Sequence, residues 1–356
     1  MYLLIIFYIS LLTTLFSTPF FIDFFTKHKI IDLPGGRRIN TYAVPRMGGV
    51  VIYLTSILSI IIFYGNLEEI KYFIFGSTLI LAVGAIDDIK DLNYKKKFLV
   101  QFIAAAFLIT FLSDGNTTLS LLGLNIPYPF DKIILTIFIV GVINAINLFD
   151  GLDGLVTGFS LLVVIVTFIL GWQLNEKLLL ILSVSLIGSL TGFLKYNTYP
   201  AKIFLGDCGS LTLGFFLVTA ALISSRDTFT GNLDLTFSVI LLATPLIDTL
   251  KVMFIRIKRG RNPFISDTSH VHHIILGSNV KHKTTVFILQ GFSLLFVIVA
   301  LIYRANFVVG LVLFISLSLL LLFIKRILSG YRKMGGQPTV KKLYTKVLGV
   351  HTKFFG

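Results

Sequence analysis

The sequence contains one cysteine and few charged residues. Cys208 stands alone, so the chain cannot form a disulfide within itself. Only 13% of the 356 residues are charged, whereas 55% are hydrophobic and the mean hydropathy is +0.91. A soluble chain of this length needs much more polar surface, because water must solvate its exterior. The composition therefore excludes an ordinary soluble protein and indicates an integral membrane protein.

Long apolar runs recur along the whole chain. Runs of about 17 to 25 apolar residues are typical of helices that cross a bilayer, because backbone amides in lipid must be satisfied within their own segment. The pattern predicts an all-α, polytopic membrane protein with about 11 transmembrane helices, the first retained rather than cleaved. The expected spans are residues 2–22, 47–64, 70–86, 98–113, 132–149, 155–172, 178–194, 210–225, 235–255, 285–303 and 307–324.

Basic residues are distributed very unevenly over the loops between these spans. Positively charged loops stay on the cytoplasmic side, so the distribution predicts an outside N-terminus and a cytoplasmic C-terminus. We expect one transmembrane domain over residues 1–324, followed by a basic cytoplasmic tail at 325–356 that either lies on the inner leaflet or is disordered. With this topology, only five of the 31 Lys and Arg residues face outside: Lys71, Lys132, Lys177, Arg226 and Arg304.

Acidic and histidine residues gather in loops that the topology places on the cytoplasmic side. Four separate loops contribute such residues at helix ends, which predicts a site assembled at the membrane surface. The residues are Asp87, Asp88 and Asp91 in DDIKD; Asp150 and Asp153 in NAINLFDGLDGL, which also carries Asn144 and Asn147 in the helix before them; Asp207 in FLGDCGS; and His270, His272 and His273 in SHVHH.

The first cluster indicates a divalent cation, and the second indicates a ligand site. Asp87 and Asp88 end an apolar helix, where ionised carboxylates are costly unless a cation such as Mg²⁺ offsets them. The alternative is a solvated helix end. The second cluster recurs every three residues and shares one helix face, from Asn144 to Asp153. Such a stripe lines a ligand site or, alternatively, binds neighbouring helices together.

The other two clusters suit phosphate groups. Asp207 lies among small residues at a helix N-terminus, which is a ready site for anions, although Asp207 could simply cap the helix. Arg261 can bind phosphate through two hydrogen bonds, and histidines can donate to phosphate or move protons. His270, His272 and His273 could instead ligate zinc, but this alternative is less favoured, since neither cysteine nor an HExxH arrangement accompanies them.

Five motifs occur in order along most of the chain: DLPGGRRINTYAVPRMGG, DDIKDL, NAINLFDGLDGL, FLGDCGSLTLG and RNPFISDTSHVHH. In this combination the chain resembles the polyprenyl-phosphate N-acetylhexosamine-1-phosphate transferase family, of the glycosyltransferase 4 type. The HxHH form of the last motif is most similar to the undecaprenyl-phosphate GlcNAc-1-phosphate transferases. The phospho-MurNAc-pentapeptide branch instead has a continuous histidine run and fewer spans.

The resemblance implies a magnesium-dependent enzyme, with manganese as an alternative, in the bacterial inner (cytoplasmic) membrane with its site facing the cytoplasm. It would transfer a sugar 1-phosphate, most simply GlcNAc-1-phosphate, from a UDP-sugar to undecaprenyl phosphate and release UMP. This is the first membrane step of cell-wall or surface-polysaccharide synthesis, such as that of teichoic acid or lipopolysaccharide O-antigen. The implied partners are these substrates and membrane lipids, without nucleic acid, and a homodimer is compatible with the family.

The resemblance also implies roles for individual residues. Asp207 and Asn147 would hold or position the metal beside the diphosphate. Asp87, assisted by Asp88, would accept a proton from the lipid phosphate or orient it, either in direct attack or through a covalent aspartyl intermediate. The remaining implied residues are Asp150 and Asp153 in the catalytic nucleotide and metal pocket; His270, His272 and His273 at the diphosphate or sugar; and Lys96 or Lys97 at a phosphate.

Other functions remain open at this point. A phospho-MurNAc-pentapeptide transferase or a transferase for another N-acetylated sugar would share these motifs. A membrane prenyltransferase would also use Mg²⁺ and a DDxxD motif, which DDIKD matches. That hypothesis, however, leaves HxHH and the GDCGS turn unexplained. An anion transporter would need polar residues through the bilayer, whereas here the ionisable groups gather on one face.

Overall fold

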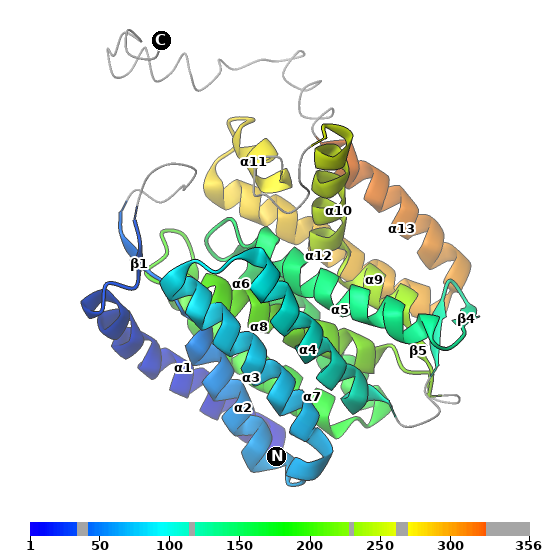
Figure 1. Cartoon of the computed structure of the whole chain (residues 1–356), viewed down its shortest axis with the longest axis horizontal. Helices are drawn as coiled ribbons and strands as arrows, with labels where there is room; N and C mark the ends of the chain where they lie inside the picture. Colours follow the sequence, from blue (N-terminus) through cyan, green and yellow to red (C-terminus); the bar gives the residue numbers. More distant parts are fainter. Residues whose placement is uncertain (34–41, 114–117, 228–230, 261–269, 325–356) are drawn as a thin grey trace, which may run out of the picture.

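The computed structural model describes residues 1–33, 42–113, 118–227, 231–260 and 270–324. The predicted tail at 325–356 lies outside these ranges. A helix lies at every predicted apolar stretch (Figure 1). The helices are α1 (Tyr2–Lys27), α2 (Gly49–Tyr64), α3 (Leu67–Lys90), α4 (Tyr94–Leu112), α5 (Phe130–Phe149), α6 (Leu155–Leu174), α7 (Lys177–Asn197), α8 (Gly206–Ser224), α9 (Leu235–Leu241), α10 (Ala243–Lys258), α11 (Val271–Leu276), α12 (His282–Ala305) and α13 (Phe307–Leu322).

Most of these helices have the dimensions of membrane spans. Within the described part of the chain, seven helices are long and apolar enough to cross a membrane, or eight if α9 and α10 form one broken span. Helices α2 and α13 are apolar but shorter, and α4 begins with three lysines within its first four residues. The chain is therefore a helical, multi-pass membrane protein, while the count of about 11 spans and the orientation of the termini stay predictions.

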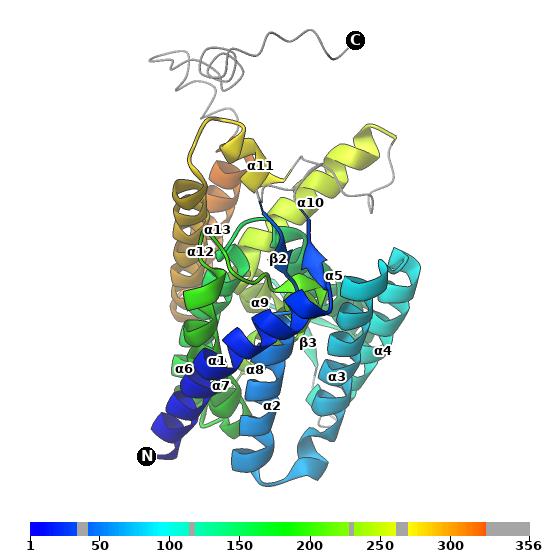
Figure 2. The ribbon, with the colours of Figure 1, turned by 90° about the vertical axis from the view of Figure 1, so that its left-hand side faces the viewer.

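The predicted span at residues 235–255 is not one straight helix. Helix α9 ends at Leu241 and α10 starts at Ala243, with an angle of 87° between them. Pro245 explains the break, because it has no N–H to donate to Leu241 and its ring would clash with that carbonyl. As a result α10 turns sharply away from the direction of α9, and α10 and α11 both lie at the same end of the bundle (Figure 2).

Helix α8 forms the centre of the bundle. Every residue from Cys208 to Ser224 is buried, and α8 packs against α2, α3, α5 and α6. The first turn of α2 lies directly on the first turn of α8, since a side chain at Gly49 would overlap the backbone of Gly209. This close contact fixes the start of α8, where Asp207 lies, against the rest of the bundle.

Two small sheets depart from the all-α prediction. Strands β1 (Ile31–Asp32) and β2 (Val44–Pro45) pair antiparallel after α1, with Asp32 opposite Val44. A second sheet, in the order β4 (Leu124–Ile126), β3 (Leu119–Leu121) and β5 (Leu233–Asp234), lies beyond the far ends of α4 and α8. The strand pair β1–β2 matters for function because it carries Asp32 and Arg46 to the pocket described next.

Candidate active site

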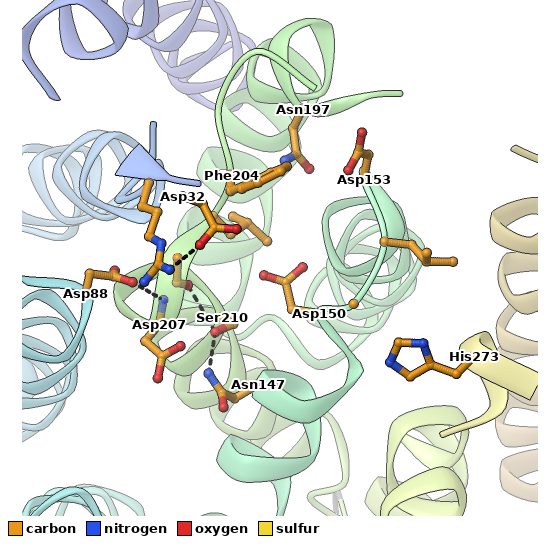
Figure 3. A pocket seen from close by; sticks show the side chains of 15 residues that line it. Asp32, Asp88, Asn147, Asp150, Asp153, Asn197, Phe204, Asp207, Ser210 and His273 are labelled. Atoms are coloured by element: carbon orange, nitrogen blue, oxygen red, sulfur yellow. Dashed lines mark hydrogen bonds and ion pairs between the residues drawn. The ribbon is translucent and has the colours of Figure 1, made fainter. Parts of the chain in front are cut away.

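A pocket of about 340 Å³ opens where the predicted cytoplasmic ends of α3, α5 and α8 meet (Figure 3). Its wall is made by β1–β2, these three helices, the loop between α5 and α6, the end of α7 and the start of α11. The wall contains five carboxylates: Asp32, Asp88, Asp150, Asp153 and Asp207. Residues separated by more than 170 positions in the sequence thus share one cavity.

Asp88 fixes the start of α8. Its Oδ1 accepts a hydrogen bond from the backbone N–H of Asp207 at 2.9 Å, and its Oδ2 accepts one from Cys208 at 3.0 Å. These N–H groups at a helix start have no partner in their own helix, and a carboxylate satisfies them well. Gly206 precedes them at φ +71, and a side chain there would strike Asp88. Asp88 therefore determines where the Asp207 side chain stands.

A lysine joins Asp87 to the pocket. Lys97 Nζ contacts Asp87 Oδ2 at 2.8 Å and Asp207 Oδ2 at 3.0 Å. The other Asp87 oxygen accepts from the N–H of Leu92 at 2.6 Å. Lys96, by contrast, is exposed. The structure thus brings Lys97 rather than Lys96 to the carboxylates, and Asp87 reaches the pocket through Lys97.

The polar stripe on α5 divides into two parts. Asn144 exchanges hydrogen bonds with Gln101 of α4, so at this position the stripe joins two helices. Asn147 donates to Ser210 Oγ of α8 at 2.8 Å and lines the pocket. Helix α5 ends at Phe149, so Asp150 and Asp153 lie in the following loop.

Asp150 occupies an unfavourable electrostatic environment. Among the described residues that line the pocket, none is drawn with a hydrogen bond to its carboxylate (Figure 3). Burial raises the pKa of Asp150 to about 8, and the negative charges of Asp207, Asp153 and Asp88 act in the same direction. A cation placed in the pocket would relieve this repulsion.

Asp153 is held more firmly than Asp150. Its Oδ2 accepts a hydrogen bond from the N–H of Ala201 at 2.9 Å, and its Oδ1 lies 4.0 Å from His282 Nε2. The His282 ring stacks on Tyr199, with ring centroids 4.4 Å apart. The end of α7 and the start of α12 therefore orient Asp153 toward the pocket.

The three histidines have different surroundings. His273 lines the pocket. His272 is buried against Gly151, where a Cβ would collide with its ring, and burial lowers the pKa of His272 to about 3, which keeps it neutral. His270 is bonded to Asp248 of α10 instead. The structure thus places one of the three predicted histidines in the pocket wall, and Arg261 lies outside the described residues.

Asp32 and Arg46 line the pocket although the sequence did not single them out. Arg46 Nη2 forms an ion pair with Asp32, across strands β1 and β2. Among the described residues, Arg46 is the only lysine or arginine in the pocket wall. Both residues belong to the first motif, and the signal that could have found them is the conjunction of an acid and a base in a loop rich in Pro and Gly.

The donor set suits a hard divalent cation. Among the described residues, no three His, Cys, Asp or Glu side chains form a metal-ligating cluster. Mg²⁺ does not require one, because it usually takes one or two protein carboxylates and completes its shell with water and substrate phosphates. Asp207, Asn147 and Asp150 supply oxygen ligands in one pocket, and the raised pKa of Asp150 marks uncompensated negative charge. The residues therefore fit Mg²⁺ or Mn²⁺.

The chain is similar in sequence to a known protein family and to several named enzymes. The model of glycosyl transferase family 4 matches residues 70–225, which contain the motifs around Asp87, Asp150 and Asp207. A probable undecaprenyl-phosphate N-acetylglucosaminyl 1-phosphate transferase of Bacillus subtilis is 30% identical, over 85% of each chain. An undecaprenyl-phosphate alpha-N-acetylglucosaminyl 1-phosphate transferase of Thermotoga maritima is 33% identical, over 86% of this chain and 92% of its own. A phospho-N-acetylmuramoyl-pentapeptide-transferase of Clostridium acetobutylicum is 31% identical, over 83% of this chain and 95% of its own. The resemblance seen in the motifs is thereby confirmed.

Proposed function

The chain belongs to glycosyl transferase family 4, and from this premise we propose that it transfers GlcNAc-1-phosphate from UDP-GlcNAc to undecaprenyl phosphate. The products are UMP and a lipid-linked sugar diphosphate. The reaction takes place on the cytoplasmic face of a bacterial inner membrane, as the first membrane step of a cell-wall or surface polysaccharide. Two relatives that align with most of this chain carry names for this reaction, which supports the proposal.

The observation that carries the proposal is the convergence of five carboxylates and Arg46 in one pocket. Phosphoryl transfer requires alignment of the reacting groups and neutralisation of charge on the phosphate oxygens. Asp207 and Asn147 would hold Mg²⁺, which when bound withdraws charge from the diphosphate oxygens. Arg46 would contact a phosphate directly, because a guanidinium binds phosphate oxygens through paired hydrogen bonds.

In the proposed step, an oxygen of the lipid phosphate attacks the phosphorus that bears the sugar. The bond from this phosphorus to the bridging oxygen breaks, and UMP leaves with the electron pair. Asp87, which is paired with Lys97, would orient the lipid phosphate or accept its proton, and Asp88 would hold Asp207 in place. Asp150 and Asp153 would line the nucleotide side of the pocket.

A second candidate is transfer of phospho-MurNAc-pentapeptide, since the Clostridium acetobutylicum relative bears that name at similar identity. The interrupted sequence His270-Val271-His272-His273 favours the GlcNAc branch. Other N-acetylated sugars fit the same chemistry.

A transfer assay with radiolabelled donors tests the proposal. Purified protein with undecaprenyl phosphate and Mg²⁺ should convert UDP-GlcNAc to lipid product faster than UDP-GalNAc or UDP-MurNAc-pentapeptide. Faster use of the pentapeptide donor would replace the first candidate by the second, and no transfer from any donor would contradict both. Stoichiometric UMP release without lipid acceptor would favour the covalent route over direct attack.

A further inference from the structure

A buried cluster of three charged or polar side chains lies outside the pocket wall. Asp248 and Arg256 belong to α10, and His270 precedes α11. Their exposed fractions are 2%, 2% and 4%. Burial of ionisable groups is costly unless they are paired, so a cluster this deep needs an explanation.

Asp248 holds the start of α11 through both carboxylate oxygens. Its Oδ1 accepts from the backbone N–H of Val271 at 2.8 Å, and its Oδ2 lies 2.9 Å from His270 Nδ1. A carboxylate on a different helix therefore satisfies the first N–H of α11 and fixes the ring of its N-cap residue at the same time. Arg256, two turns further along α10, contacts the same ring from its other nitrogen.

The two partners also fix the tautomer of His270. A carboxylate only accepts, so Nδ1 carries the hydrogen toward Asp248. Nε2 faces Arg256 Nη2 at 3.5 Å, and because arginine only donates, Nε2 must accept. Both ring nitrogens of His270 thus face protein side chains, as expected of a scaffold residue rather than of a group that donates to phosphate.

The short segment that Asp248 holds reaches directly into the pocket. Two residues beyond His270, the ring of His272 packs on Gly151, between Asp150 and Leu152 of the pocket wall. The next residue, His273, lines the pocket itself. A displacement of the helix start would therefore move both the support of Gly151 and the imidazole of His273.

We propose that Asp248 is a positioning residue that holds residues 270–273 over the pocket and thereby sets the location of His273. The functional part of this inference rests on the proposed transfer reaction. Asp248 touches no substrate and acts through the histidine segment. The break at Pro245 contributes, because it turns α10 by 87° from α9, and Asp248 lies just after this bend, where it meets His270 and Val271.

Substitution Asp248→Asn tests the inference with almost no change in volume. The amide oxygen can still accept from Val271, but the amide N–H₂ opposes the hydrogen on His270 Nδ1 and forces the other tautomer against Arg256. Loss of comparable supporting contacts typically costs about 10- to 100-fold in activity, and we expect a fall in kcat of that size. Thr249→Val is the matched control, because this neighbouring hydroxyl is buried and has no hydrogen-bond partner among the described residues. Its kcat should stay within about twofold of the wild-type value.

A double variant separates positioning from a general loss of structure. If Asp248 acts mainly through the location of His273, Asp248→Asn should lower kcat by a clearly smaller factor when His273→Ala is already present than in the wild type. Equal losses in both backgrounds would contradict the inference. So would wild-type kcat in Asp248→Asn alone.

Hydrogen exchange tests the structural part independently of the reaction. The amides of residues 271–276 should exchange at least about tenfold faster in Asp248→Asn than in Thr249→Val, while α8 remains protected in both. Unchanged exchange in this segment overturns the inference even if transfer is observed. Faster exchange without transfer activity in the wild type would instead retain Asp248 as the holder of this segment and reject the proposed reaction.

Discussion

Two carboxylates at opposite ends of the helix bundle, Asp234 and Asp150, have different surroundings. At the end remote from the pocket, Asp234 accepts hydrogen bonds from the N–H of Thr236 at 2.9 Å and from the hydroxyl of Tyr303 at 2.9 Å, so it caps α9 and joins α12 to it. At the pocket, Asp150 has no such donor among the described residues, and its burial and three further carboxylates raise its pKa. Paired carboxylates hold the fold, whereas crowded ones indicate a site that is completed by a cation or substrate.

Removing a carboxylate from the pocket should have the largest effect. We expect Asp207→Asn and Asp150→Asn each to lower the rate of sugar-phosphate transfer by about 100-fold or more, because each removes charge that stabilises the bound cation and diphosphate. Initial rates at saturating donor, with Mg²⁺ in excess, provide the measurement. Wild-type rates in both variants would show that the pocket is not the site of the reaction.

The two neighbouring lysines offer a narrower comparison. Lys97→Gln should lower the transfer rate by about tenfold, since it removes the charge that joins Asp87 to Asp207. Lys96→Gln, one position away and exposed, should have a rate close to that of the wild type. Equal losses in the two variants would mean that general positive charge, and not the ion pair with Asp87, supports the reaction.

Asp150→Asn should also stabilise the metal-free protein. The pKa of Asp150 is about 8 in the folded state and near its ordinary value of 3.8 in the unfolded chain. The folded state therefore holds a proton that the unfolded state has released, and this group makes stability fall as the pH rises from about 4 to 8. The asparagine side chain does not ionise, so the Tm of the variant should exceed that of the wild type by a few degrees at pH 9 in a chelator. The difference should shrink toward pH 5, and a lower Tm at pH 9 would contradict the account.

At the end remote from the pocket, a substitution should lower the Tm instead of raising it, and this change in stability should be the smallest of the predicted effects. Tyr303→Phe removes one hydrogen bond to Asp234 and should cost about 1 kcal/mol of stability. Transfer activity should be unchanged, because Tyr303 lies at the opposite end of α12 from His282. A Tm equal to or above that of the wild type, or a marked loss of activity, would remove the contrast between the two ends.

The sequence was sufficient to predict the helices and to predict that carboxylates from separate loops lie close together. Apolar runs alone located a helix at each expected stretch, since a bilayer span needs a continuous apolar segment. Asp88 at the end of α3, Asp150 after α5 and Asp207 at the start of α8 line the same pocket. This agrees with the expectation that their loops lie on one side of the membrane. Loops on the same side of a membrane can lie next to one another, which explains why residues far apart in the sequence could be expected to share one pocket.

Other features depended on tertiary contacts that no pattern encodes. Pro245 gave a local signal for the break in residues 235–255, but the apolar composition outweighed it in the prediction. Spacing could not tell Asn144, which binds Gln101, from Asn147 on the same face, because the partner lies on another helix. The separation of His270 from His273 likewise depends on Asp248, 22 positions before His270 in the chain.

Cation binding to the purified protein tests the central claim most directly. Mn²⁺ can be followed by electron paramagnetic resonance during titration of the protein in the presence of UMP. We expect one bound Mn²⁺ per chain that Mg²⁺ displaces, with affinity weakened at least about tenfold in Asp207→Asn and unchanged in Tyr303→Phe. Binding of equal strength in Asp207→Asn, or no specific binding in the wild type, would contradict the assignment of this pocket as the site where a divalent cation holds the phosphates.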